Sequence, residues 1–143
     1  MPDSILSLLG MARKAGKLEL GEEPALGAAR AKKARLLLVA HDAADNTYRR
    51  VRHVAETSST TWCALPRTKS ELGDAVGTTS CAIAALTDAG FAASLAEKLA
   101  AADPDRYGAL AGELRVKADR LLQRRKEQLR HEKNLRTGKK RRG

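Results

Sequence analysis

The run Arg35–Ala40, RLLLVA, constrains the fold more than any other stretch of the chain. It is short, continuously apolar and followed by the polar pair His41–Asp42. A strand that is buried on both faces carries such a run, whereas a strand with one solvated face alternates apolar and polar residues. The sequence therefore predicts a central strand over Arg35–Ala40, in an α/β domain whose helices cover the sheet.

Helix-like and strand-like segments alternate around this run. Apolar residues at helical spacing predict amphipathic helices over Ser4–Ala15 and Asp45–Thr57. Further strands are expected over Lys17–Leu20, Thr60–Leu65 and Ser80–Leu86, and further helices after Gly21, Thr68 and Asp88. The alternation predicts a layered α/β sandwich with a small, parallel or mixed sheet.

Local signals mark the ends of several of these helices. Gly21 is followed by two acids and Pro24, all of which suit the first turn of a helix. Thr68 and Glu71 have the spacing of a capping box, in which two backbone donors are satisfied reciprocally. Gly77 suits a left-handed stop at the end of the short helix that follows Thr68.

The net charge of +10 is unevenly distributed along the chain. Residues 1–103 hold 13 Lys and Arg against 12 Asp and Glu, whereas residues 104–143 hold 14 against 5. We therefore expect a near-neutral α/β domain over residues 1–103 and a basic C-terminal arm over residues 104–143. A basic arm of this kind indicates a polyanionic partner.

The arm itself changes character along its length. Leu110, Leu114, Ala118 and Leu121 form a narrow apolar stripe, so the start of the arm is expected to be helical and to dock. Residues 120–142 hold 11 basic side chains and two acids, with little to bury, so we expect a frayed helix that grades into disorder. Binding to phosphates through this run would depend steeply on salt and would not distinguish RNA from DNA. The candidate contacts are Arg124, Arg125, Lys126, Arg130, Lys139, Lys140, Arg141 and Arg142.

Signatures of catalysis and of cofactor binding are missing from the sequence. No GxGxxG or GxxxxGK[ST] motif is present, and the three histidines lack metal-ligand spacing. Asp42 is the one carboxylate at the end of a central strand, and we interpret it as a capping group. We therefore expect no enzymatic activity, no cofactor and no metal.

Cysteine usage and hydropathy bear on the compartment. Cys63 and Cys81 lie in separate strand-like runs without CxxC spacing, which indicates two buried thiols and no disulfide framework. No apolar stretch approaches the ~20 residues that a membrane-spanning helix needs, and the N-terminus is unlike a signal peptide. A cytoplasmic protein with no membrane partner is expected.

Four stretches in register carry a resemblance to a known family. They are LLGMARKAGKLELGEE, LLLVAHDA, ELGDAVG and IAALTDAGFA, and together they lie within residues 4–100. In this order and spacing they resemble the kink-turn RNA-binding ribosomal protein superfamily of the L-seven-Ae and L-thirty-e type, in its bacterial YlxQ-like branch. The resemblance implies a three-layer α/β/α sandwich with a four-stranded mixed sheet.

The resemblance also implies an RNA site made of two neighbouring loops. The first is a Gly-x-Asn-Glu-x-x-Lys stretch whose side chains read guanine edges in the family, and its glycine corresponds to Gly21. Its Asn, Glu and Lys positions hold Glu23, Pro24 and Gly27 here, so the three base-reading groups are changed. The absence of each base contact costs about 1–3 kcal/mol of discrimination. The second loop corresponds to residues 77–80, which pack against a flipped-out nucleotide in the family.

Basic residues near the first loop complete the expected site. Lys14, Lys17 and Lys32 are expected to flank that loop and to hold phosphates. The full set of candidate RNA contacts in the domain is Lys14, Lys17, Gly21, Glu22, Glu23, Gly27, Lys32, Lys33, Thr78, Thr79 and Ser80.

Two functional hypotheses remain open at this point. The first is a non-catalytic RNA-binding accessory protein for ribosomal or other structured RNA, whose affinity comes largely from the basic arm. The second is a protein–protein adaptor of the transcription or translation machinery, which the changed base-reading residues favour. Some RNA ribose methyltransferases carry a similar domain, but this sequence shows no cofactor fingerprint of its own. The oligomeric state is not predicted.

Overall fold

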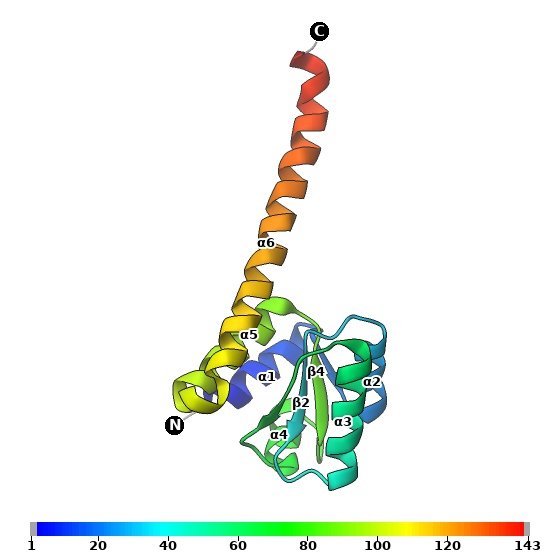
Figure 1. The fold of residues 1–143 in the computed structure, drawn as a ribbon, viewed down its shortest axis with the longest axis vertical. Coiled ribbons are helices and arrows are strands. Elements are labelled where there is room, and N and C mark those ends of the chain that lie inside the picture. Colours follow the sequence, from blue (N-terminus) through cyan, green and yellow to red (C-terminus); the bar gives the residue numbers. More distant parts are fainter. Residues whose placement is uncertain (1–2, 142–143) are drawn as a thin grey trace.

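The computed structural model describes the backbone of residues 3–141 and the side chains of residues 3–136. Six helices and four strands make up this part of the chain (Figure 1). The helices are α1 (Ser4–Lys14), α2 (Glu22–Arg30), α3 (Asp45–Ser58), α4 (Lys69–Val76), α5 (Ala89–Ala102) and α6 (Pro104–Arg141). The strands are β1 (Leu18–Leu20), β2 (Leu36–Ala40), β3 (Trp62–Leu65) and β4 (Ile83–Leu86).

The four strands form one mixed sheet in the order β1-β4-β2-β3. β2 pairs with β3 in parallel and with β4 in antiparallel register, with Leu38 opposite both Cys63 and Ala84. β1 pairs antiparallel with β4 at the other edge. The mixed four-stranded sheet implied by the family resemblance is therefore confirmed.

Helices cover both faces of the sheet, so the fold has three layers (Figure 1). Alternate residues of β2 point to opposite sides: Leu36 and Leu38 pack with α1, α4, α5 and α6, while Leu37 and Val39 pack with α2 and α3. All five residues of β2 are buried, as the continuous apolar run predicted. This strand is the shared floor of two hydrophobic cores.

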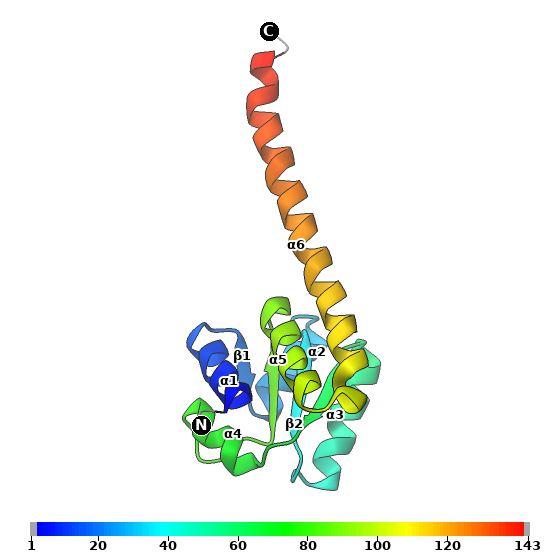
Figure 2. The ribbon, with the colours of Figure 1, turned by 90° about the vertical axis from the view of Figure 1, so that its left-hand side faces the viewer.

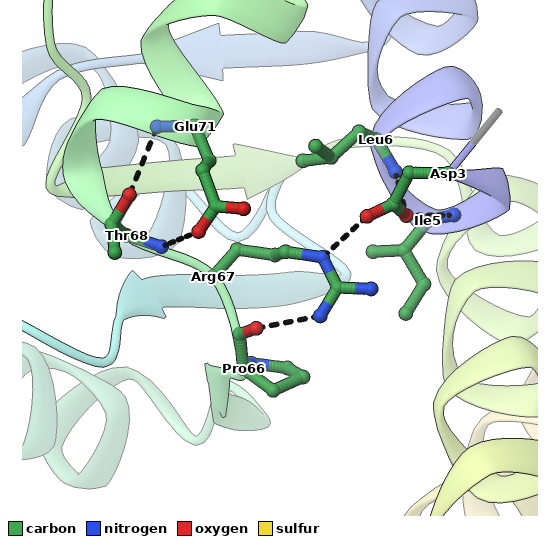
Figure 3. Close-up of polar contacts among 7 residues, drawn as sticks. All are labelled: Asp3, Ile5, Leu6, Pro66, Arg67, Thr68 and Glu71. Atoms are coloured by element: carbon green, nitrogen blue, oxygen red, sulfur yellow. Dashed lines mark hydrogen bonds and ion pairs between the residues drawn. The ribbon is translucent and has the colours of Figure 1, made fainter. Parts of the chain in front are cut away.

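The helix-end signals act as predicted. The Thr68 side chain accepts the Glu71 N–H at 3.0 Å, and the Glu71 carboxylate accepts the Thr68 N–H at 2.9 Å, which completes the capping box (Figure 3). Gly77 ends α4 at φ +79°, in the left-handed region. Gly21 precedes α2 at φ +92°, a conformation that residues with a Cβ rarely adopt.

The first four turns of α6 belong to the domain core. Tyr107, Ala111, Leu114 and Ala118 are buried in the same cluster as α1 and α5. Leu114 and Ala118 of the predicted docking stripe are thus buried, its Leu110 and Leu121 are half-buried, and Tyr107 and Ala111 are additional anchors. From Leu122 onward every described side chain of α6 is exposed, and the helix projects away from the domain (Figure 2).

The arm differs from expectation in that helix continues without interruption to Arg141. Disorder was expected because this part of the arm has little apolar surface to bury. Leu, Arg, Lys, Glu and Gln, however, have high intrinsic helix propensity, and side-chain pairs four residues apart add support. One such pair is the 3.1 Å hydrogen bond from Gln123 Nε2 to Glu127 Oε1.

Both cysteines are free and buried, as predicted. Burial raises the pKa of the Cys63 thiol to about 12, so this thiol is unreactive at neutral pH. Within residues 3–141, the structure has no helix whose length and apolar character match a membrane-spanning segment.

Candidate nucleic-acid interface

One edge of the sheet brings together the two loops that the family resemblance identified. β1, β2 and β3 end at this edge, and β4 begins there, because β4 runs antiparallel to both of its neighbours. The Gly21 N–H donates to the Ile83 carbonyl at 2.9 Å, and the Ala40 N–H donates to the Ala82 carbonyl at 2.9 Å. The Gly21 loop and the segment 77–82 therefore lie side by side. We call this the two-loop edge.

Few ligand-binding groups are presented by the Gly21 loop itself. The Glu22 carboxylate is ion-paired with Arg50 of α3, and Glu23 is exposed. A Cβ placed on Gly27 would have open space around it, so nothing in the fold excludes a longer side chain there. The loop thus has an acidic character that opposes phosphate, and it lacks the amide and ammonium groups of the family pattern.

Close packing on α4 positions the second loop. A Cβ on Gly73 would lie 2.7 Å from the Ser80 nitrogen, so only glycine permits this approach. The Thr78 N–H donates to the Gly73 carbonyl at 2.8 Å, and the Thr78 hydroxyl donates to the Ser80 carbonyl at 3.4 Å. Thr78, Thr79 and Ser80 are exposed. Their polar groups are available to a ligand.

Two other charged groups at the two-loop edge, Asp42 and Arg67, are engaged within the protein. Asp42 accepts the Lys69 N–H at 2.8 Å, so it caps the start of α4, in line with the interpretation from sequence. Arg67 donates from Nε to Asp3 Oδ2 at 2.6 Å and from Nη1 to the Pro66 carbonyl at 2.6 Å (Figure 3). The Arg67 hydrogen bond lowers the pKa of the Asp3 carboxyl, although partial burial opposes this.

Two of the three lysines expected beside the Gly21 loop lie at the other end of the sheet. The Lys17 carbonyl accepts the Thr87 N–H at 3.0 Å, and Thr87 follows the carboxyl end of β4. Lys32 and Lys33 precede β2, and so they lie near the edge at which β2 begins. Lys17 and Lys32 are thus not neighbours of Gly21 in the fold, and their expected contact with RNA stays a prediction. β1 lies between Lys17 and Gly21, and α2 lies between Gly21 and Lys32.

Lys32 and Lys14 also have distinct surroundings. The Lys32 ammonium donates to the carbonyl of Ser58, the last residue of α3, at 2.5 Å. A cation there complements the helix dipole, so Lys32 has a structural contact independent of any ligand. Lys14 lies at the end of α1 and lines a hollow between α1 and α4 together with Arg13 and Gly77.

Cations gather instead at the edge of the sheet where β2 begins, which we call the opposite edge. Arg35 of this edge and Lys117, Arg120 and Arg124 of α6 line one cleft of about 190 Å³. A neighbouring hollow is lined by Lys17, Arg35 and Arg125, and also by Asp88 and Asp119. The candidate contacts expected from the sequence did not include Arg35, Lys117 or Arg120. The position of Arg35 directly before the central strand was the available signal.

The remaining candidates on α6 lie along its exposed part. Arg124, Arg125, Lys126 and Arg130 are exposed. The side chains of Lys139, Lys140 and Arg141, and the whole of Arg142, lie outside the described residues. No group of three or more His, Cys, Asp or Glu side chains in the described part of the chain is arranged to hold a metal ion.

Comparison with known proteins identifies the domain. Residues 3–96 match the Ribosomal protein L7Ae/L30e/S12e/Gadd45 family. The chain belongs to this family. The match spans α1 to the middle of α5, and α6 lies outside it, so family membership accounts for the two-loop edge but not for the arm.

Two individual proteins are similar to parts of the chain. An RNA-binding protein YlxQ from Enterococcus faecium is 43% identical over 47 residues, which are 33% of this chain and 46% of that protein. The aligned part thus spans about half the length of this curated relative. A solved structure of a protein with unknown function from Bacillus halodurans has a TM-score of 0.62 and 27% identity, covering 67% of this chain and 96% of that one.

Proposed function

We propose that this chain is a non-catalytic RNA-binding protein, an accessory factor for ribosomal or other structured RNA, and that α6 supplies most of its affinity. Family membership and the RNA-binding name of the Enterococcus faecium relative support the RNA partner. The main support for an affinity that comes from α6 is the row of cations on that helix. Arg120, Arg124, Arg125, Lys126 and Arg130 have no ion-pair partner among the described residues.

The geometry of α6 suits a phosphate backbone. The helix continues beyond Leu121 for roughly 30 Å, at 1.5 Å rise per residue. The two described acids of this part, Glu127 and Glu132, accept hydrogen bonds from Gln123 and Gln128, and no ion pair joins them to Arg124, Arg125, Lys126 or Arg130 within residues 3–136. Cations without internal partners release counterions from a nucleic acid when they bind it, and this release drives association.

The two-loop edge contributes little sequence reading in this account. Glu23, Pro24 and Gly27 hold none of the base-reading groups of the family pattern, and Glu22 is neutralised by Arg50. A kink-turn RNA and a variant with its sheared G·A pairs disrupted should therefore bind with similar affinity. An affinity more than ten-fold higher for the intact kink-turn would show that the two-loop edge does recognise the sheared G·A pairs.

Truncation tests the role of the arm. A chain ending at Arg125 keeps every buried residue of α6 and removes the exposed cations that follow. Its affinity for a structured ribosomal RNA fragment should fall sharply, and the slope of log K against log salt should flatten by roughly 0.7 to 0.9 for each phosphate that the shorter chain no longer binds. Equal affinity and equal slope for the two chains would refute the arm-dominated proposal. A DNA duplex of the same length, measured in parallel, tests the choice of RNA over DNA.

The alternative is a protein–protein adaptor of the transcription or translation machinery. Exposed leucines on the arm favour it: Leu122 and Leu129 are 51% and 59% exposed and, seven residues apart, they share one face of α6. An interaction with a defined protein of that machinery that survives nuclease treatment and is abolished in Leu122→Ala/Leu129→Ala would support the adaptor.

A further inference from the structure

We propose that the domain binds a single-stranded RNA segment in the cleft between the root of α6 and the opposite edge, away from the two loops of the family site. The inference rests on the proposed function in that it assumes an RNA partner. It adds a site on the globular domain, built from Arg35 of the sheet edge and from Lys117, Arg120 and Arg124 of α6.

The cations of this cleft converge from two parts of the sequence. Arg35 directly precedes β2, and its N–H is fixed by a 2.7 Å hydrogen bond to the Leu86 carbonyl. Lys117, Arg120 and Arg124 follow one another at spacings of three and four residues, which places them on one face of α6. The Cβ atoms of successive members lie about 5–6 Å apart. No acidic side chain lines the cleft. The site therefore offers several phosphate-binding groups in a row.

Three of the four cations have no side-chain partner in the part of the chain whose side chains the structure describes. Arg35, Arg120 and Arg124 make no side-chain hydrogen bond or ion pair within residues 3–136. Lys117 differs, because it donates to Glu113 at 3.0 Å and to the Thr61 hydroxyl at 3.3 Å. Uncompensated guanidinium groups next to one another repel, and a bound phosphate removes that repulsion and gains bidentate hydrogen bonds.

The floor of the cleft favours a single strand over a duplex. The half-buried Leu121 of α6 and Ala89 of α5 line the cleft with the cations, above the buried Leu114 and Ala92. A duplex presents phosphates but keeps its bases stacked inside, so it would leave this apolar surface uncovered. A single strand can place a sugar or base on the floor while its phosphates meet the arginines.

Further cations between the cleft and the exposed part of α6 indicate the path of the bound strand. Lys17 and Arg125 line the adjoining hollow, and further cations follow on α6 at Lys126 and Arg130. Asp88 and Asp119 also line that hollow, but Asp88 accepts the Phe91 N–H at 2.9 Å and Asp119 lies 3.8 Å from Arg115. One strand could thus run from the opposite edge out along α6.

Charge reversal in the full chain tests the site. The variant is Arg35→Glu/Arg124→Glu, and the matched control is Arg49→Glu/Arg52→Glu on exposed positions of α3, which changes the net charge equally. The probe is a fluorescently labelled 12-nucleotide oligouridylate, measured by anisotropy across a salt series. Circular dichroism verifies that both variants keep the helical content of the parent.

The cleft variant should bind at least ten-fold more weakly than the control and with a flatter salt slope. Equal losses in the two variants would overturn the proposal, because they would show dependence on net charge alone. Binding of a blunt duplex RNA as tight as that of the single strand would also overturn it. If the parent chain binds neither the single strand nor the duplex, the proposed RNA-binding function is wrong as well. If the parent binds RNA but the cleft variant loses no more affinity than the control, only the cleft proposal is wrong.

Lysine footprinting on the unaltered chain provides a measurement that needs no variant. With the oligouridylate bound, Lys17 and Lys117 should be protected from acetylation, while Lys69 at the two-loop edge should react as in the free protein. Protection of Lys69 without protection of Lys17 and Lys117 would place the strand at the two-loop edge and overturn the proposal.

Discussion

The Tyr107 hydroxyl donates a 2.6 Å hydrogen bond to the carbonyl of Ala64, and this contact fixes the first turn of α6 to the outermost strand of the sheet. Ala64 belongs to β3, the edge strand, which pairs on one side only, with β2. Tyr107 is 3% exposed and lies in the same core as α1 and α5. The basic arm is thus the continuation of a helix whose first turns are anchored in the domain, and this anchoring fixes the direction in which the cations of the arm extend.

Tyr107→Phe should destabilise the fold by about 1 kcal/mol, because the edge carbonyl of Ala64 loses its donor while the ring stays in place. Urea unfolding followed by circular dichroism measures the change. Tyr48→Phe is the matched control: its hydroxyl reaches the Ala40 and His41 carbonyls at the longer distances of 3.1 and 3.2 Å. A smaller loss in Tyr107→Phe than in Tyr48→Phe would contradict the anchoring role.

Leucines on either side of the point where α6 leaves the domain should respond differently to truncation. Leu114→Ala should cost about 2–5 kcal/mol, because Leu114 is 3% exposed and its removal leaves a cavity in the core. Leu122→Ala should change the free energy of unfolding by less than about 0.5 kcal/mol, because Leu122 is 51% exposed. Thermal unfolding of both variants checks this. Similar losses of unfolding free energy in the two variants would show that α6 does not leave the domain core between Leu114 and Leu122.

The Asp3–Arg67 ion pair should make stability depend on pH at the acidic end. The pKa of the Asp3 carboxyl is lowered in the folded state, so the pair stabilises fully above the ordinary carboxyl pKa of about 4, and this stabilisation disappears as pH falls through the folded value. Asp3→Asn keeps the helix cap and removes the charge. It should cost about 0.5–1 kcal/mol at pH 7, and this cost should shrink as pH falls through the folded pKa of Asp3. A cost that does not vary with pH would rule out the ion pair as its source.

Two glycines in helices should respond to alanine with opposite signs. Gly73→Ala should destabilise by about 1–3 kcal/mol, because its Cβ would meet the Ser80 nitrogen at 2.7 Å and displace the second loop. Gly27→Ala should stabilise by about 0.5–1 kcal/mol, because its Cβ meets open space and alanine favours the helix. Chemical denaturation measures both, and a Gly73→Ala protein as stable as the parent would show that the second loop does not rest on α4.

Much of the fold was predictable because its signals are local. The apolar run of β2, the capping box at Thr68 and the left-handed stop at Gly77 each depend on residues within a few positions of one another. The strands Thr60–Leu65 and Ser80–Leu86 were predicted too long, since they begin at Trp62 and Ile83. The residues before those points belong to loops at the sheet edges.

The candidate site was less predictable because it depends on the direction of each strand. Lys17 is close to Gly21 in sequence, but β1 carries the chain across the sheet between them. Arg35 and Arg124 are far apart in sequence and meet only because α6 returns over α5. The exposed arm is more helical than its lack of buried surface predicts, because its Leu, Arg, Lys, Glu and Gln residues have high intrinsic helix propensity.

Ultraviolet crosslinking of the full chain to a structured ribosomal RNA fragment, with the crosslinked residues mapped by mass spectrometry, tests the central claim most directly. The account predicts crosslinked peptides from α6 beyond Lys117 and from the opposite edge around Lys17 and Arg35. Crosslinks confined to Gly21–Glu23 and Thr78–Ser80 would contradict it and would place the RNA at the two-loop edge.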